Sequence, residues 1–192
     1  MTDRPIIFDA GAMRSLLAGR KTQARRLAAS PLGECRPGDR LWVKERFVGG
    51  RMVAGGGREV ASRMRGADYV VLADGWRRYP DGSGQPGAIP TNRDLKWYPA
   101  IHMPRWASRA TLVVESVRRE RLQAVSRKDA LAEGQLASFA GLYWNWRGPI
   151  RGVWRDPRRA FAANWDAIHD RRGERWEDDP EVVVLEFRLE GT

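Results

Sequence analysis

In the first 48 residues, hydrophobic positions follow a helical spacing in one segment and alternate with polar positions in others. These patterns predict short strands around one helix. Apolar residues recur at helical spacing over residues 9–18, where Asp9 is a suitable N-cap and Gly19 follows the last turn. Strands are expected over residues 4–8, 23–28 and 40–48. The strand over residues 40–48 places Leu41, Val43 and Glu45 on one face, and Trp42 and Lys44 on the other.

The second half of the chain predicts two long strands and a short helix between them. Residues 111–121 and 181–189 are expected to be strands. Ser126-x-x-Asp129 has the form of a capping box, so a helix should begin there and end near residue 133.

A further helix is predicted to begin at Asp156-Pro157. Phe161, Trp165 and Ile168 follow at helical spacing and are expected to form its core face. Strands therefore outnumber helices and are joined mainly by turns, which favours an α+β fold with a small barrel-like sheet.

Two stretches depart from these regular patterns. Residues 49–95 hold ten of the twenty glycines, and only residues 68–73 among them resemble a strand. We expect a long loop or hairpin there, inserted into the domain. Residues 135–155 are aromatic and irregular, and predict a second elaboration. The whole chain, residues 1–192, is expected to form a single domain carrying both.

The composition indicates a globular protein. Hydrophobic residues make up 42% of the 192 residues and charged residues 30%. No apolar run approaches the ~18 residues of a membrane span, and the N-terminus is charged rather than signal-like. Cys35 has no second cysteine with which to pair, so nothing suggests secretion. The expected compartment is the cytoplasm, without a membrane partner.

The charge points to a polyanionic partner. The formal net charge is +10, and 30 of the 34 cations are arginine. Such an excess suits a nucleic acid or a nucleotide, while a GC-rich genome is an alternative source of the arginine preference. The nine tryptophans either stack on bases or fill the core.

Several site types are poorly supported. His102, His169 and Cys35 show no zinc-ligand spacing, so we expect no metal, although a site built from carboxylates stays open. The chain has no G-x-S-x-G motif, and the glycines of residues 49–57 are not followed by G-K-[ST]. No cofactor is predicted.

The segment of residues 16–26 is the most suggestive. Four cations fall within seven residues, and Thr22 lies among them: Arg20, Lys21, Arg25 and Arg26. Such a cluster binds phosphate or activates a hydroxyl or water through a desolvated lysine. The alternative is a solvated charge at a helix end.

Here the sequence resembles a known family. The matching pieces, in order, are Gly19-Arg20-Lys21-Thr22, Arg26, Gly38-Asp39-x-Leu41-x-Val43, Asp129-Ala130-x-x-Glu133-Gly134 and Glu186-Phe187. Together they look like the ASCH domain, a PUA-like fold with a small mixed β-barrel and flanking helices. Residues 102–109 (HMPRWASR) and 120–123 (ERLQ) resemble the longer phage and prophage branch of the family. The resemblance implies that the protein is encoded by a phage, or by a prophage in a bacterial host.

The resemblance implies a cleft for a nucleoside or nucleic acid. Small bacterial members are amidohydrolases that deacylate N4-acetylcytidine and related cytidines, and are thought to use a lysine, a threonine and a glutamate. The lysine corresponds to Lys21 and the glutamate to Glu133, but Ala24 stands at the threonine position. In that chemistry a hydroxyl attacks the acyl carbon, lysine takes its proton or lowers its pKa, and glutamate relays the proton to the amine.

The side chain of Ala24 has no oxygen. The hydroxyl of Thr22 lies two residues away, about 6.6 Å along a strand, and is too far to replace the missing hydroxyl without rearrangement. Three explanations follow: a binding-only relative, hydrolysis by a water between Lys21 and Glu133, or an engineered inactivation. The functions weighed are therefore an N4-acylcytidine amidohydrolase, a non-catalytic RNA- or DNA-binding module, and, more weakly, a ribonuclease.

A wider set of residues is expected to bind the substrate. It comprises Arg20, Thr22, Arg26, Lys44, Glu45, Arg105, Trp106 and Arg109. Arginines 105 and 109 either contact phosphate beside a base stacked on Trp106, or flank a core tryptophan. The natural substrate and the oligomeric state stay open.

Overall fold

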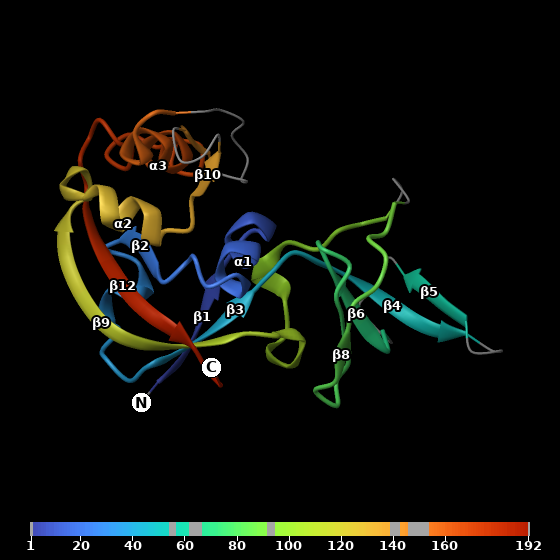
Figure 1. Ribbon diagram of the computed structural model, residues 1–192. Coiled ribbons are helices and arrows are strands. Elements are labelled where there is room, and N and C mark those ends of the chain that lie inside the picture. The colour runs from blue at the N-terminus through green and yellow to red at the C-terminus, as the bar shows by residue number, and fades with distance from the viewer. Residues whose placement is uncertain are drawn as a thin grey trace. The chain divides into compact units, whose positions relative to one another are not determined.

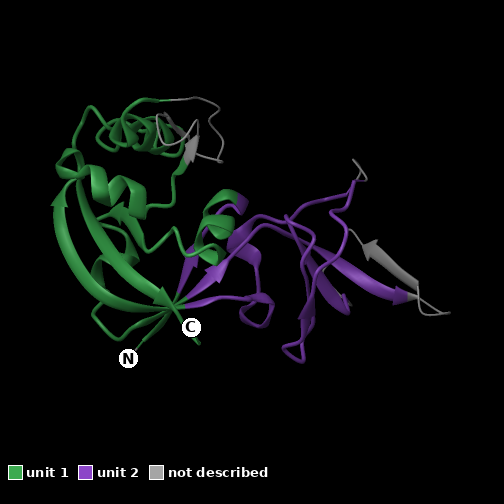
Figure 2. Ribbon diagram, in the orientation of Figure 1, with its two compact units in different colours: residues 1–4, 11–41, 112–192 green, residues 5–10, 42–111 purple. Residues whose placement is uncertain are grey.

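The computed structural model describes residues 2–53, 57–61, 67–91, 95–138, 143–145 and 154–191. The chain forms two compact units, coloured separately in Figure 2. Unit 1 comprises residues 1–4, 11–41 and 112–192, and unit 2 comprises residues 5–10 and 42–111. Lys21 and Glu133 belong to unit 1, whereas Glu45 and Arg109 belong to unit 2.

Strands outnumber α-helices among the described residues, and the fold is α+β, as predicted. The elements of unit 1 are α1 (Ala10–Leu17), β2 (Gln23–Leu27), η1 (Pro31–Glu34), β9 (Thr111–Arg121), η4 (Leu122–Ala124), α2 (Arg127–Ala132), β10 (Leu136–Ser138), β11 (Tyr143–Asn145), α3 (Pro157–Asp166) and β12 (Glu181–Leu189) (Figure 1). The first of two five-stranded sheets also contains β1 (Asp3–Ile7) and β3 (Arg40–Lys44), in the order β1-β3-β9-β12-β2. The chain passes between the units within α1, β1, β3 and β9. No helix in the described part of the chain is long and apolar enough to cross a membrane.

Strand β12 lies between β9 and β2 in this sheet. It pairs antiparallel with β9 on one side and with β2 on the other, so that Leu185 lies opposite both Val117 and Ala24. The register of β12 with β9 shifts between Glu186 and Phe187. Such an irregularity bends a strand, and β9 and β12 curve together in Figure 1.

Helices α2 and α3 pack against each other and cover an apolar core of unit 1. The core contains Leu122, Val125, Ala130, Phe161, Trp165, Val182 and Val184. The prediction of core positions is confirmed for Phe161 and Trp165 but wrong for Ile168, which is 58% exposed. Because α3 ends at Asp166, helical spacing does not extend to residue 168.

Unit 2 contains a second sheet where the sequence predicted mainly loop. Its strands are β4 (Phe47–Val53), β5 (Gly57–Ala61), β6 (Tyr69–Leu72), β7 (Arg77–Arg78) and β8 (Gly84–Gln85), in the order β5-β4-β6-β7-β8. Short helices η2 (Ala100–His102) and η3 (Arg105–Ala107) follow. Two apolar clusters lie among its described residues: one contains Phe47, Val70, Leu72, Met103 and Ala107, and the other contains Val48, Tyr69 and Val71.

A glycine that suggested a loop lies within a strand of this sheet. Gly50 pairs with Tyr69 across β4 and β6, and a Cβ atom at Gly50 would lie 2.2 Å from the Tyr69 ring. Glycine is therefore used here for close packing of an aromatic ring rather than for a turn.

The strand predicted over residues 40–48 is divided into β3 and β4. The break follows from tertiary contacts at both of its sides. The Glu45 backbone N–H donates to Met103 Sδ at 3.0 Å, and Phe47 pairs with Tyr98 instead of continuing the first sheet.

Candidate functional site

The segment that carries Arg20 and Lys21 is positioned by the end of α1. Gly19 has a φ of +69°, and its N–H donates to the Leu16 carbonyl at 2.9 Å. The Ser15 carbonyl accepts hydrogen bonds from the N–H groups of Arg20 at 2.9 Å and Lys21 at 3.1 Å. This pattern is a Schellman motif, which turns the chain back over the last turn of the helix.

The same segment is joined to the end of α2. Lys21 and Glu133 form an antiparallel bridge, and the Thr22 N–H donates to the Ala132 carbonyl at 2.9 Å. Gly134 follows with a φ of +98°, and the Ser15 hydroxyl donates to its carbonyl at 2.7 Å. Residues distant in the sequence are thereby held beside one another.

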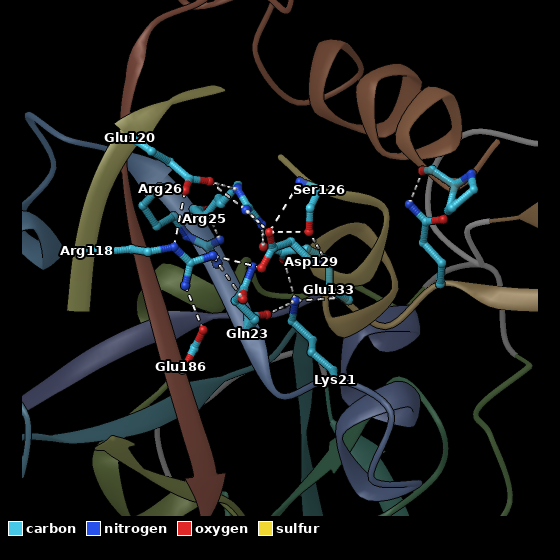
Figure 3. Close-up of polar contacts among 12 residues, drawn as sticks. Lys21, Gln23, Arg25, Arg26, Arg118, Glu120, Ser126, Asp129, Glu133 and Glu186 are labelled. Carbon is cyan, nitrogen blue, oxygen red and sulfur yellow. Dashed lines mark hydrogen bonds and ion pairs between the residues drawn. The ribbon is translucent and has the colours of Figure 1, made fainter. Parts of the chain in front are cut away.

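The Lys21 amine is surrounded by three acceptors. It donates to the Gln23 carbonyl at 2.8 Å, to the Glu133 carbonyl at 2.9 Å and to Glu133 Oε2 at 3.0 Å (Figure 3). The side chains of Lys21 and Glu133 are each only 4% exposed. Three acceptors match the three donors of a lysine ammonium group, so this geometry holds a charged ion pair.

Arg25 binds the other oxygen of Glu133. Its Nη1 donates to Glu133 Oε1 at 3.1 Å, and its Nη2 donates to Glu120 Oε1 at 2.7 Å. The Arg25 side chain is fully buried, and its guanidinium lies 5.6 Å from the centre of the Phe161 ring. Both carboxylate oxygens of Glu133 are therefore already occupied by cations of the chain itself.

Arg118 extends these contacts across the sheet, as Figure 3 shows. It forms ion pairs with Asp129 at 2.8 Å, Glu186 at 2.6 Å and Glu120 at 3.1 Å. We call the connected residues the charge network: Lys21, Arg25, Arg118, Glu120, Asp129, Glu133 and Glu186. Three cations face four carboxylates, so every positive charge of the charge network is compensated within it and its formal net charge is −1.

Two carboxyl groups of the charge network have lowered pKa values. Burial alone would raise the pKa of Asp129, but hydrogen bonds from Ser126 and the charges of Arg25 and Arg118 lower it below its usual value. A hydrogen bond from the Ser116 hydroxyl at 2.8 Å, followed by Arg118, lowers the pKa of Glu186. Both groups are therefore held in the charged form at neutral pH.

Ala24 lies in β2 between two members of this region. Its side chain is fully buried, and it pairs with Leu185 of β12. Successive side chains of a strand point to opposite faces, so Ala24 faces away from the side chains of Gln23 and Arg25. A side chain at position 24 thus projects to the other face of β2 from the one that contacts Glu133.

A pocket lies at α1, next to the Lys21–Glu133 junction. Its volume is about 240 Å³, and we call it the α1 pocket. Its lining residues are Gly11, Arg14, Ser15, Arg20 and Leu136. Arg20 was predicted from the sequence as a substrate-binding residue, whereas Arg14 was not.

Other predicted binding residues have different surroundings in unit 1. Thr22 is exposed. Arg26 is partly buried, and its Nη1 donates to the Arg25 carbonyl at 2.7 Å.

In unit 2, Glu45 and Arg109 form a separate ion cluster. Arg109 binds Glu45 through two hydrogen bonds of 2.9 and 2.8 Å, and binds Asp74 at 2.8 Å. The side chains of Glu45 and Arg109 are almost completely buried. The Arg109 guanidinium also lies 5.8 Å from the centre of the Trp76 ring.

Trp106, which was predicted to bind the substrate, packs into a core of unit 2. The predicted binding residues Lys44 and Arg105 contact a different tryptophan. Trp106 packs against the cluster that contains Phe47 and Met103. Lys44 and Arg105 instead lie over Trp42, at 5.1 and 5.5 Å from the ring centre.

Most of the charge network was missed by sequence reasoning. Arg25 was noted only as one of four clustered cations, and Arg118, Glu120 and Glu186 had no assigned role. A signal was present, because polar residues alternate along β2 at Gln23 and Arg25 and along β9 at positions 116, 118 and 120. Alternation indicates a shared face, but only the strand pairing shows that these faces meet.

No protein-family model and no curated protein matches the sequence. Two solved structures are similar to it. The hypothetical protein PH0355 has a TM-score of 0.45 at 9% identity, with 98% of this chain and 99% of that chain covered. An ASCH domain from Lactobacillus crispatus JV V101, the family that the sequence resembles, has a TM-score of 0.38 at 15% identity, with 98% and 79% covered. At these TM-scores, neither likeness assigns a family or a function to this chain.

Proposed function

We propose that this chain is a non-catalytic module that binds RNA or DNA. The observation that carries the proposal is that the cations of the charge network are paired with carboxylates of the same network. The chain has a formal net charge of +10, whereas the charge network contributes −1, so the remaining residues carry +11. An excess of this size outside a closed network is available to phosphates of a nucleic acid.

The geometry of Lys21 and Glu133 supports binding rather than hydrolysis. A general base needs a free lone pair, and a proton relay needs an oxygen within reach of the substrate. The Lys21 amine already donates to three acceptors, and both Glu133 oxygens are in ion pairs. These two side chains join the segment before β2 to the end of α2.

Fluorescence anisotropy with labelled single-stranded RNA and DNA tests the proposal. We expect binding in low salt and a linear fall of log Kobs with log salt concentration, because phosphate contacts release counterions. The labelled RNA should remain intact on a denaturing gel after the same incubation. Absence of binding to both nucleic acids at low salt contradicts the proposal, and shortened RNA favours a ribonuclease instead.

An N4-acylcytidine amidohydrolase is the second candidate. It is favoured by the 3.0 Å contact between Lys21 and Glu133, the two residues that the ASCH resemblance implies for catalysis. The test is incubation of the wild type and of Ala24→Thr with N4-acetylcytidine, followed by chromatography of cytidine. We expect no cytidine from either protein, because position 24 faces away from the side chains of Gln23 and Arg25.

Two outcomes would change this conclusion. Cytidine released by the wild type, and lost on Lys21→Met with the protein still folded, would establish hydrolysis without the threonine. Cytidine released only by Ala24→Thr would identify an amidohydrolase that lacks its hydroxyl. Thermal unfolding of each variant controls for folding, since a larger side chain at a fully buried position costs about 1–3 kcal/mol.

A further inference from the structure

The α1 pocket is formed by local geometry at the end of a helix. Arg14 lies on the last turns of α1, and the Schellman motif at Gly19 brings Arg20 back beside Ser15. Gly11 adds no side chain to the wall, and Leu136 closes it from β10. Two arginines separated by six positions in the sequence thus line one cavity.

The two arginines of the α1 pocket have no partner among the described residues. Neither guanidinium forms a hydrogen bond or an ion pair there, and both side chains are exposed. No acidic residue is among the described residues that line the pocket. Arg25 and Arg118 differ in this respect, because each is bound by two or more carboxylates. The α1 pocket therefore presents uncompensated positive charge in a concave site.

The size of the α1 pocket suits one group of a ligand. A volume of about 240 Å³ is below the roughly 300–1,000 Å³ of a complete small-molecule site. The Ser15 hydroxyl proton is already donated to the Gly134 carbonyl. Among the described lining residues, the side-chain donors left for a ligand are therefore those of the two arginines. A planar guanidinium offers paired N–H donors that match the oxygens of a phosphate.

We propose that the α1 pocket binds a phosphate group of a nucleotide or nucleic acid through Arg14 and Arg20. This inference rests on the proposed function and specifies which group of the ligand is held and where. It also specifies the ligand class, because a nucleoside lacks the group that the two arginines bind. The anion lies beside the Lys21–Glu133 junction, since Arg20 directly precedes Lys21 in the chain.

Matched double variants test the inference. Arg14→Gln/Arg20→Gln removes two charges from the α1 pocket, and Arg171→Gln/Arg172→Gln removes two from exposed arginines that do not line it. Binding of each protein to cytidine 5′-monophosphate, cytidine, inorganic phosphate and a labelled single-stranded oligonucleotide is measured by calorimetry or anisotropy. Thermal unfolding should be unchanged in both variants, because all four side chains are exposed.

We expect the pocket variant to bind cytidine 5′-monophosphate and the oligonucleotide at least tenfold more weakly than the wild type. Its salt slope with the oligonucleotide should also fall by about 1, as expected for one lost phosphate contact. The control variant should stay within about twofold for cytidine 5′-monophosphate, and cytidine should not compete. Competition by inorganic phosphate would identify the phosphate itself as the group bound.

The failures of the two proposals are distinguishable. Equal loss of oligonucleotide affinity in both double variants would leave nucleic-acid binding standing and overturn the phosphate site. The same holds if cytidine binds as tightly as its monophosphate. A wild-type protein that binds cytidine 5′-monophosphate but no oligonucleotide would overturn the proposed function and retain the pocket as a nucleotide site. Binding of neither ligand overturns both.

Discussion

Gly134 is the residue on which the junction at the candidate site depends most directly. Its φ of +98° disfavours any side chain. A Cβ atom there would also lie 2.7 Å from Ser15 Cβ and 3.0 Å from Lys21 Cβ. The position therefore combines a conformational requirement with close packing of three segments.

We predict that Gly134→Ala lowers the free energy of unfolding by about 2–5 kcal/mol, the sum of about 1–2 kcal/mol of left-handed strain and about 1–3 kcal/mol of overpacking. Gly173→Ala is the matched control, because Gly173 has a φ of +87° and nothing within 4 Å of a Cβ atom. The control should cost only about 1–2 kcal/mol. Urea unfolding measures both, and equal losses would contradict the packing argument.

Glu133 is the second residue whose role can be tested by a small change. Glu133→Gln keeps the shape of the side chain but removes the carboxylate charge that pairs with both Lys21 and Arg25. We predict a loss of about 3 kcal/mol in the free energy of unfolding, as for a buried pair that loses one partner. Lys21→Met/Glu133→Leu should recover part of this loss, because an apolar pair leaves fewer buried charges.

Urea unfolding of the wild type and of both variants provides the measurement for Glu133. A Glu133→Gln protein as stable as the wild type would show that the ion pair contributes no stability. That result would contradict the stabilising role assigned to Glu133.

At the scale of elements, α2 shows how much a short helix depends on its cap. It contains six residues, too few for helix propensity alone to stabilise it. The Ser126 hydroxyl accepts from the Asp129 N–H at 3.1 Å and donates to Asp129 Oδ2 at 2.6 Å. The capping box therefore orients a carboxylate of the charge network as well as the helix.

We predict that Ser126→Ala costs about 1 kcal/mol of stability, the typical value of a lost N-cap. Lys128→Ala, at an exposed position of the same helix, should change stability by no more than about 0.5 kcal/mol. Chemical denaturation followed by tryptophan fluorescence compares the two variants. Similar effects in both would show that the cap does not stabilise α2.

Local signals predicted the elements well where a motif marks their ends. The capping box at Ser126 is present as predicted, and Asp156 caps α3 by accepting a hydrogen bond from the Arg158 N–H. The strand over residues 111–121 has the predicted bounds. The signals failed around Gly50 and Glu45, because the partners that decide those conformations, Tyr69 and Met103, lie far away in the sequence.

At the scale of the whole molecule, the charge network makes stability depend on pH. Asp129 and Glu186 have lower pKa values in the folded state than the usual values of about 3.9 and 4.3. A carboxyl of this kind contributes stability above its unfolded-state pKa, and the contribution is lost as the pH falls through the folded-state pKa.

We therefore predict a thermal unfolding midpoint that changes little between pH 7 and about pH 5 and falls below about pH 4. Asp129→Asn should lower the midpoint at pH 7 and reduce the steepness of the acid decline. Calorimetry over this range provides the measurement. A variant with the same acid slope as the wild type would exclude Asp129 as a contributor.

The sequence by itself determined the elements whose causes are local: the helix caps, the two long strands, and the glycine that ends α1. It also determined the charge excess and brought Lys21 and Glu133 into consideration through a resemblance. Only the tertiary structure decided that Arg25 shares Glu133, that Arg14 joins Arg20 in one pocket, and that Ile168 is exposed. The physical reason is that periodicity specifies which face of a strand or helix a residue occupies, whereas strand pairing and packing specify which faces meet.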